Sequence, residues 1–187
     1  MHGNHWSRFC VAIVIPFIAL ADHGGDKKGD SGNNSGNRPF VSSILGSIPG
    51  LVVGGVPSGG APWTIDTGRA SLSPNGKLNV EVRGLVLTTG APPNLVGTTG
   101  SVQMVAASLV CGGSGGTVAA STDGVPIGTT GDADIDANLS LPATCMAPVV
   151  LVRVFVSTAV PGSQLGPFIA VTGFNKSGNS GDDNDQQ

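Results

Sequence analysis

The stretch from Trp63 to Leu87 constrains the fold more than any other part of the chain. Its centre, Ser73-Pro74-Asn75-Gly76, is a turn sequence, because proline presets φ at the second position and glycine accepts a left-handed conformation. After the turn, Leu78, Val80 and Val82 alternate with polar residues, which is typical of a strand with one dry and one wet face. The pattern predicts a β-hairpin whose loop ends in a G1 bulge.

The strand before this turn changes its alternation once. Ala70 and Leu72 share a parity, whereas Trp63 and Ile65 have the opposite one. Gly68 lies near the change, and a glycine inside a strand pattern often marks an irregular position. We therefore predict a β-bulge at Gly68.

Composition extends the β prediction to the rest of the chain. The sequence has 30 Gly, 13 Pro and no Tyr, and charged residues make up 11%, against about a quarter in an average protein. The net charge of −3 and the lack of a basic cluster argue against a nucleic-acid partner. Frequent glycines and prolines among Val, Thr, Ser and Ala indicate an all-β domain with many turns.

Further segments have the short apolar or alternating pattern of strands. They are residues 41–56, 102–111, 117–121, 125–127, 131–141, 149–156 and 168–174. Together with the hairpin they predict about eight to ten strands in an antiparallel β-sandwich of Ig-like or Greek-key type. A helix over residues 101–109 is the alternative there, because Met and Ala favour helix.

The first 21 residues have the features of a secretory signal peptide. Arg8 precedes an apolar run from Cys10 to Ala21, and Ala19-Leu20-Ala21 fits the small-x-small cleavage pattern. The run is shorter than the roughly 20 residues of a transmembrane helix, so no membrane span is expected after cleavage. An uncleaved anchor or a buried strand is the alternative. We expect a secreted, extracellular protein.

Two segments without large apolar residues flank the predicted core. Residues 22–38 should form a flexible linker and residues 175–187 a disordered acidic tail, because neither can bury enough surface to offset its ordering entropy. The β-sandwich domain is therefore expected over residues 39–174, a length that is ordinary for one domain.

Cys111 and Cys145 are the only cysteines outside the predicted signal peptide. An even pair in an exported protein predicts one disulfide bond. Two reduced thiols in a cytosolic protein are the alternative. Neither cysteine belongs to a C-x-x-C motif and no histidine lies nearby in sequence, so the pair does not indicate a metal site.

The predicted domain lacks the side chains of the common catalytic triads. Its sequence contains no histidine, which excludes Ser-His-Asp and Cys-His catalysis in their usual forms. A hydrolase that uses two Asp side chains stays possible, although no spacing marks a pair. We expect a non-catalytic protein without a cofactor.

Asp132, Asp134 and Asp136 alternate with apolar residues, so they should project from one strand face about 7 Å apart. Their mutual repulsion could be relieved by calcium or by Arg and Lys on a neighbouring strand. The spacing resembles the start of an EF-hand loop, but Ala137 and Ala143 stand where that loop has Gly and Glu.

Two further side chains have two interpretations each. Trp63 is the only Trp of the predicted domain, and it serves either as a core anchor or as a stacking platform for a sugar. Arg153 interrupts an apolar strand, and it either pairs with an Asp on the adjacent strand or faces water from an edge strand.

Several runs resemble a group of uncharacterised small secreted bacterial all-β proteins: GAPWTIDTGRASLSPNGKLNVEVRGLVL, SLVCGG and PFIAVTGF. The portion G-x-A-x-L-x-x-x-G-K-L-x-V-x-V-x-G-L in the central hairpin also resembles the opening of chordin-type CHRD domains. Those domains continue with a histidine-containing strand, which this chain lacks. The first resemblance implies secretion and a β fold, and neither transfers a functional residue.

These observations predict a secreted, non-catalytic protein with a structural, adhesion, cell-surface or matrix role and an extracellular partner. One alternative is an extracellular module that binds carbohydrate through Trp63 or calcium through the three aspartates. The other is an Asp-dependent hydrolase.

Overall fold

The computed structural model describes residues 38–156 and 164–174, which contain strands and a 3-10 turn but no α-helix. The predicted signal peptide and acidic tail, and all of the predicted linker except Arg38, lie outside the described residues. The strands are β1 (Phe40–Gly46), β2 (Val52–Val53), β3 (Val56–Pro57), β4 (Trp63–Thr64), β5 (Thr67–Leu72), β6 (Lys77–Arg83), β7 (Val86–Leu87), β8 (Met104–Cys111), β9 (Thr117–Ser121), β10 (Val125–Pro126), β11 (Ala133–Asn138), β12 (Val149–Phe155) and β13 (Leu165–Thr172). Among these residues, no helix has the length and hydropathy needed to cross a membrane.

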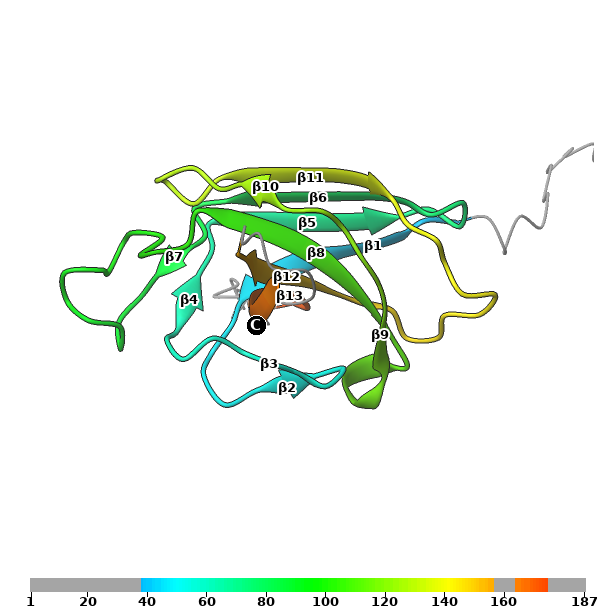
Figure 1. Cartoon of the computed structure of the whole chain (residues 1–187), viewed down its shortest axis with the longest axis horizontal. Coiled ribbons are helices and arrows are strands. Elements are labelled where there is room, and N and C mark those ends of the chain that lie inside the picture. Colours follow the sequence, from blue (N-terminus) through cyan, green and yellow to red (C-terminus); the bar gives the residue numbers. More distant parts are fainter. Residues whose placement is uncertain (1–37, 157–163, 175–187) are drawn as a thin grey trace, which may run out of the picture. The chain divides into compact units, whose positions relative to one another are not determined.

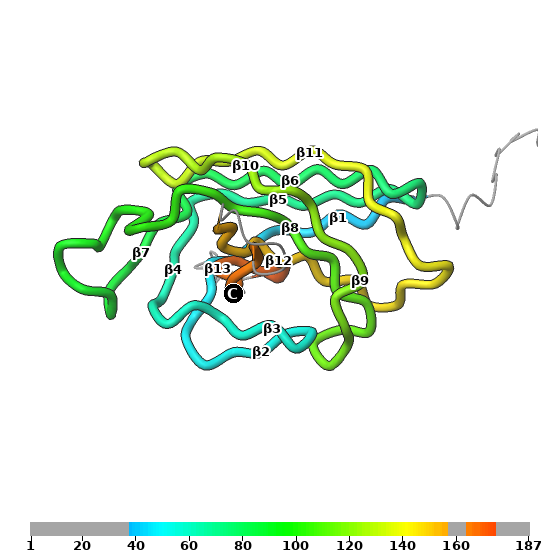
Figure 2. Tube along the Cα trace, in the orientation of Figure 1, coloured from blue at the N-terminus to red at the C-terminus, as the bar shows by residue number. Residues whose placement is uncertain are grey.

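The longer strands form one curled antiparallel sheet in the order β10-β8-β12-β13-β1-β5-β6-β11, and β9 also pairs with β8 (Figure 1). The short pairs β2–β3 and β4–β7 lie outside it. Curling brings one end of the sheet towards the other, so that β10 approaches β11 without pairing with it (Figure 2). The all-β prediction is therefore confirmed, and the sheet is curled.

Strand β1 joins the two halves of this sheet. Its first part pairs with β5, as Phe40 does with Leu72, and its second part pairs with β13, as Ile44 does with Thr172. The main buried cluster collects side chains from both halves, among them Leu78, Val80, Val82, Val105, Leu109, Ile135, Val150, Val152 and Ile169. The apolar residues that alternate in the sequence thus face a shared interior.

Strand β8 is buried on both faces. Leu109 belongs to the main cluster, whereas Val110 belongs to a second cluster with Val56, Leu151 and Phe168. Val56 comes from β3, so the β2–β3 pair covers part of the outer face of the sheet. This explains why the segment lacks clean alternation, and the strand prediction rather than the helical alternative is confirmed.

The central hairpin is confirmed as β5 and β6. The backbone N–H of Ser73 donates to the carbonyl of Lys77, and the N–H of Gly76 donates to that of Ser73. Gly76 has φ of 90°, which is the left-handed region expected at the end of this turn. The turn residues therefore act as the sequence predicts.

The bulge predicted at Gly68 is wrong. Gly68 pairs with Val82 inside an unbroken ladder, and the change of parity lies between β4 and β5. Two residues separate β4 from β5, and two separate β6 from β7, so neither strand carries an extra residue. Instead, the buried side chains switch from even to odd positions on both sides of the ladder at the same level. On the β6–β7 side, Val82 is buried before Gly84 and Leu85 after it. Gly84 has φ of 66°.

Alanine at Gly76 should destabilise the fold strongly. A Cβ there would overlap the carbonyl oxygen of Leu139, and φ is unfavourable for an L-residue. Gly50→Ala is the matched control, because Gly50 has φ of 85° with no atom within 4 Å of an added Cβ. We expect Gly50→Ala to cost about 1–2 kcal/mol, and Gly76→Ala clearly more, in urea unfolding. Equal losses would show that the contact with Leu139 is unimportant.

Candidate functional site

Polar side chains cover the face of β5, β6 and β11 that points away from the main core. Arg83 links β6 to β11 on this face: its Nη2 lies 2.9 Å from Glu81 Oε1 on its own strand and 2.9 Å from Asp134 Oδ1 on β11. The hydrogen bond to Asp134 raises the pKa of Arg83. Solvent screens exposed ion pairs of this kind, so they order the face more than they stabilise the protein.

The three aspartates of the predicted calcium site each have their own protein partner. Asp132 accepts hydrogen bonds from the N–H of Gly84 and the hydroxyl of Thr130. Asp134 pairs with Arg83, and Asp136 accepts a hydrogen bond of 2.8 Å from Asn79 Nδ2. Within residues 38–156 and 164–174, no three His, Cys, Asp or Glu side chains form a group suited to a metal ion. Calcium binding by these residues stays a prediction.

Asp132 should make stability depend on acidity. Its hydrogen bonds to Gly84 and Thr130 lower its pKa from the ordinary 3.8. A lowered folded pKa means that the ionised group stabilises the fold above its unfolded pKa, and that this contribution is lost as pH falls through the folded value. We expect Asp132→Asn to be less stable than the wild type near neutral pH, with the difference vanishing in acid.

Urea unfolding at a series of pH values measures this difference. Asp123→Asn is the control and should change the unfolding midpoint little at neutral pH, because among the described residues only the Asp123 backbone carbonyl, and not its carboxylate, accepts a hydrogen bond. A difference between Asp132→Asn and the wild type that stays constant down to acid would contradict the assignment.

Trp63 lies inside the main buried cluster and is 7% exposed. It pairs with Leu87 across the β4–β7 ladder, and its backbone N–H donates to the carbonyl of Ser47. In this conformation its ring presents no open face on which a sugar could stack. The geometry therefore supports the role of core anchor.

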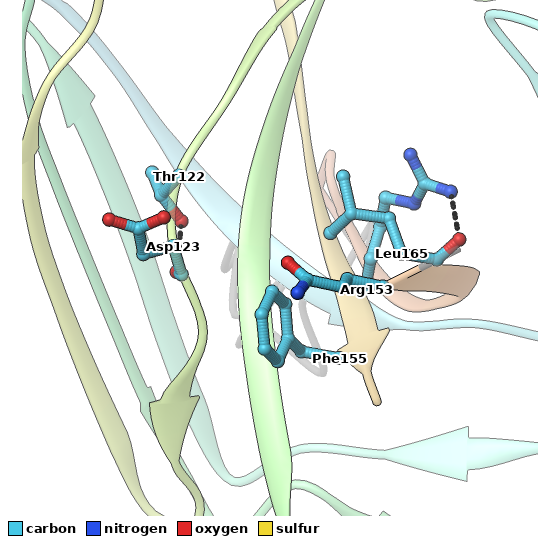
Figure 3. A pocket seen from close by; sticks show the side chains of 6 residues that line it. Thr122, Asp123, Arg153, Phe155 and Leu165 are labelled. Carbon is cyan, nitrogen blue, oxygen red and sulfur yellow. Dashed lines mark hydrogen bonds between the residues drawn. The ribbon is translucent and has the colours of Figure 1, made fainter. Parts of the chain in front are cut away.

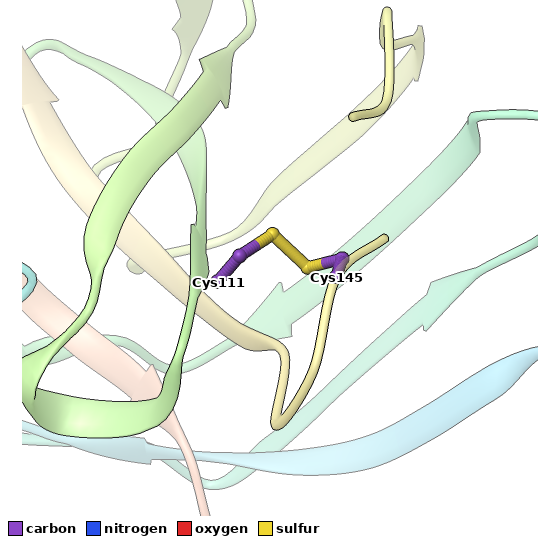
Figure 4. The surroundings of a disulfide bond; sticks show 2 residues. All are labelled: Cys111 and Cys145. Atoms are coloured by element: carbon purple, nitrogen blue, oxygen red, sulfur yellow. A yellow bond between two sulfur atoms is a disulfide. The ribbon is translucent and has the colours of Figure 1, made fainter. Parts of the chain in front are cut away.

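The predicted disulfide between Cys111 and Cys145 is present (Figure 4). It joins the end of β8 to the loop between β11 and β12, and the two Cα atoms are 5.0 Å apart. Beside it, the N–H of Gly112 donates to the carbonyl of Met146, and the N–H of Gly113 to that of Ala147. The bond therefore anchors a loop that has no regular secondary structure.

Arg153 meets neither sequence expectation, because β12 lies between β8 and β13 and the guanidinium bonds to backbone. Nε lies 2.8 Å from the carbonyl oxygen of Gly166, and Nη2 lies 2.9 Å from that of Leu165 (Figure 3). The β12–β13 register is irregular here, and Pro167 has no N–H for the ladder. Arg153 thus donates hydrogen bonds to two β13 carbonyls where the β12–β13 register is irregular. Burial lowers the pKa of Arg153.

A cavity of about 430 Å³ lies beside Arg153 and is also lined by Thr122, Asp123, Phe155, Gln164 and Leu165. Its two charged groups do not converge, since the Asp123 carboxylate points away from Arg153 (Figure 3). Arg153 already uses two of its nitrogens on backbone carbonyls. This cavity therefore lacks the convergent polar groups typical of a ligand site.

The stronger candidate is a second cavity of about 420 Å³, here called the seam, between the two ends of the curled sheet. One wall comes from the β9–β10 region and the other from β11. Its lining residues are Ser121, Thr122, Asp123, Val125, Ile135, Asp136, Ala137, Asn138 and Leu139. Asp123 precedes β10 and Asp136 lies on β11, and these two strands are at opposite ends of the strand order. The seam brings both residues to one concave surface.

The sequence predicts the strands on both sides of the seam but not the seam itself. Alternating Asp residues are one available signal, because exposed charges are common on edge strands, where they discourage pairing with other chains. The strand order determines which edge of the sheet faces β11. No local sequence pattern encodes that order.

No protein-family model, curated protein or solved structure matches this chain. The resemblance to secreted bacterial proteins and to CHRD domains stays a prediction.

Proposed function

We propose that this chain is an exported, non-catalytic domain that binds a partner outside the cell, in a surface, matrix or adhesion role. The observation that carries the proposal is the disulfide between Cys111 and Cys145 in an all-β domain. Disulfides persist in oxidising compartments and are rare in the cytosol. The apolar run and cleavage pattern of residues 1–21 support the same location.

We further propose that the two halves of the curled sheet act as the two layers of a β-sandwich. Two observations support this: β1 changes partner from β5 to β13 along its length, and the main buried cluster draws side chains from both halves. This arrangement leaves the charged face of β5, β6 and β11 exposed to solvent. A rigid, polar, exposed sheet face suits binding better than the enclosure of a reacting group.

The test combines retention with turnover. Purified protein is mixed with cell-wall, matrix and glycan preparations, and both the bound fraction and released products are measured. Retention without product is the expected result, whereas steady release of product would overturn the non-catalytic role. Separately, the mature protein recovered from culture medium should lack the first 21 residues, and an intact N-terminus confined to the cytosol would contradict export.

A second function is favoured by one observation, namely that Asp123 and Asp136 both line the seam. Acid-base hydrolysis of a glycoside needs two carboxylates that flank the bond, and these two residues each carry one. If product release is found, Asp136→Asn should abolish it while Asp134→Asn, which alters a carboxylate outside the seam, should not. Product release that survives Asp136→Asn would rule out this pair.

A further inference from the structure

Strand β11 has one free edge. It pairs with β6 on one side and, among the described residues, with no strand on the other. The N–H of Leu139 donates to the carbonyl of Gly76, which continues the β11–β6 ladder. Because bonded pairs alternate in an antiparallel ladder, the odd-numbered residues of β11 bond to β6. The backbone N–H and C=O groups of Asp136 and Asn138 must then point away from β6.

These outward groups lie at the seam, since Asp136 and Asn138 both line it. No backbone hydrogen bond between described residues occupies them. A row of open N–H and C=O groups is a template for an added strand. The seam volume of about 420 Å³ falls in the range of roughly 300–1,000 Å³ that ligand pockets occupy.

The charges of the seam indicate which kind of partner segment could add to β11 as a strand. Asp123 and Asp136 are its only charged lining residues, and neither forms an ion pair with a described Lys or Arg. Its apolar lining is small and consists of Val125, Ile135, Ala137 and Leu139. An added strand therefore finds backbone partners, two carboxylates without an ion-pair partner among the described residues, and a shallow apolar wall.

A second copy of the chain fits this edge poorly. Pairing two β11 edges would bring two rows containing Asp134 and Asp136 against each other, and like charges on adjacent strands are destabilising. The charge pattern therefore favours a strand of opposite sign over self-association.

We propose that the seam binds an extended peptide segment of a partner, with Lys or Arg at alternate positions, as an added strand on β11. Main-chain hydrogen bonds would form with Asp136 and Asn138, and the basic side chains would reach Asp136 and Asp123. The proposal deepens the binding role given above and rests on it. It does not depend on export or on a particular matrix, so its test is independent of the export and retention experiments.

The probe is a short labelled peptide in which lysine alternates with threonine, titrated with the purified protein at low salt. Two matched peptides accompany it: one has glutamate for lysine, and one is N-methylated on alternate amides, which removes backbone donors but keeps the charge. We expect saturable binding of the lysine peptide, no binding of the glutamate peptide, and at least about tenfold weaker binding of the N-methylated one.

Protein variants locate the site. Asp123→Asn combined with Asp136→Asn should weaken lysine-peptide binding about fivefold or more, whereas Asp134→Asn, on the same strand but outside the seam, should change it little. Hydrogen exchange adds a direct readout, because the amides of Asp136 and Asn138 should become protected when the peptide binds. Unchanged far-ultraviolet circular dichroism verifies that each variant is folded.

Four outcomes of the peptide experiments would overturn the proposal. They are no saturable binding of the lysine peptide, equal binding of the N-methylated peptide, an equal loss in Asp134→Asn, and protection of amides elsewhere but not at Asp136 and Asn138. Self-association of the unliganded protein through β11 in sedimentation would also overturn it, because the edge would then have another occupant. None of these results bears on whether the chain is exported or retained on a matrix.

Discussion

The double variant Cys111→Ser/Cys145→Ser is expected to lose about 4 kcal/mol of unfolding free energy relative to the oxidised wild type. The bond closes a loop with a sequence separation of 34, and cross-linking a loop of that size restricts the unfolded chain. It also fixes the loop before β12 against the end of β8. Urea unfolding under oxidising conditions measures the difference.

The reduced wild type serves as the control for this prediction. Adding a reductant should lower its unfolding midpoint to that of the double variant and should leave the variant unchanged. A variant as stable as the oxidised wild type would mean that the hydrogen bonds of Gly112 and Gly113 to Met146 and Ala147 already hold the loop. In that case the disulfide would contribute little to the fold.

Phe168→Ala is expected to cost about 3–5 kcal/mol, because it removes a large side chain from a site that cannot collapse easily. Phe168 is 0% exposed and packs in the second cluster with Val56, Val110 and Leu151. Its loss would leave a cavity between the main sheet and the β2–β3 pair. Denaturant unfolding measures this loss. If the slope of unfolding free energy against denaturant concentration is unchanged, the loss comes from packing in the native state.

Phe174→Ala provides a matched comparison, since Phe174 is 85% exposed. The same chemical change there should stay within about 0.5 kcal/mol of the wild type. If Phe168→Ala were as mild as Phe174→Ala, the second cluster would not help to hold β2 and β3 on the sheet. Protease susceptibility near Val53 should rise in Phe168→Ala alone, because Val53 packs against that cluster.

The sequence predicts those parts of the fold whose causes are local. The turn before Gly76 and the alternation of residues 131–141 each carry their own pattern, and both appear in the structure. The cysteine pair was also predictable, because only two cysteines lie outside the apolar N-terminal run. Neighbouring residues determine the turn and the strand, and the number of cysteines determines the disulfide pairing.

Features that depend on strand order could not be predicted in this way. Arg153 looked like an edge residue or an ion-pair partner, but its carbonyl partners lie on β13, where Pro167 accompanies an irregular register. The parity change near Gly68 involves both strands of the ladder, which one strand's pattern cannot show. The seam needs Asp123 and Asp136 to meet across opposite ends of a curled sheet.

The position of β1 in the sheet has a consequence for how the chain reaches its native state. The first strand bonds to the last, since Ile44 pairs with Thr172, and β1 therefore lies unpaired along half its length until β13 has been synthesised. Contacts of such high sequence separation slow folding, because a long loop must close before they form. A chain that completes its sheet only at its C-terminal end should therefore form the β1–β13 pairing as one of its last folding events.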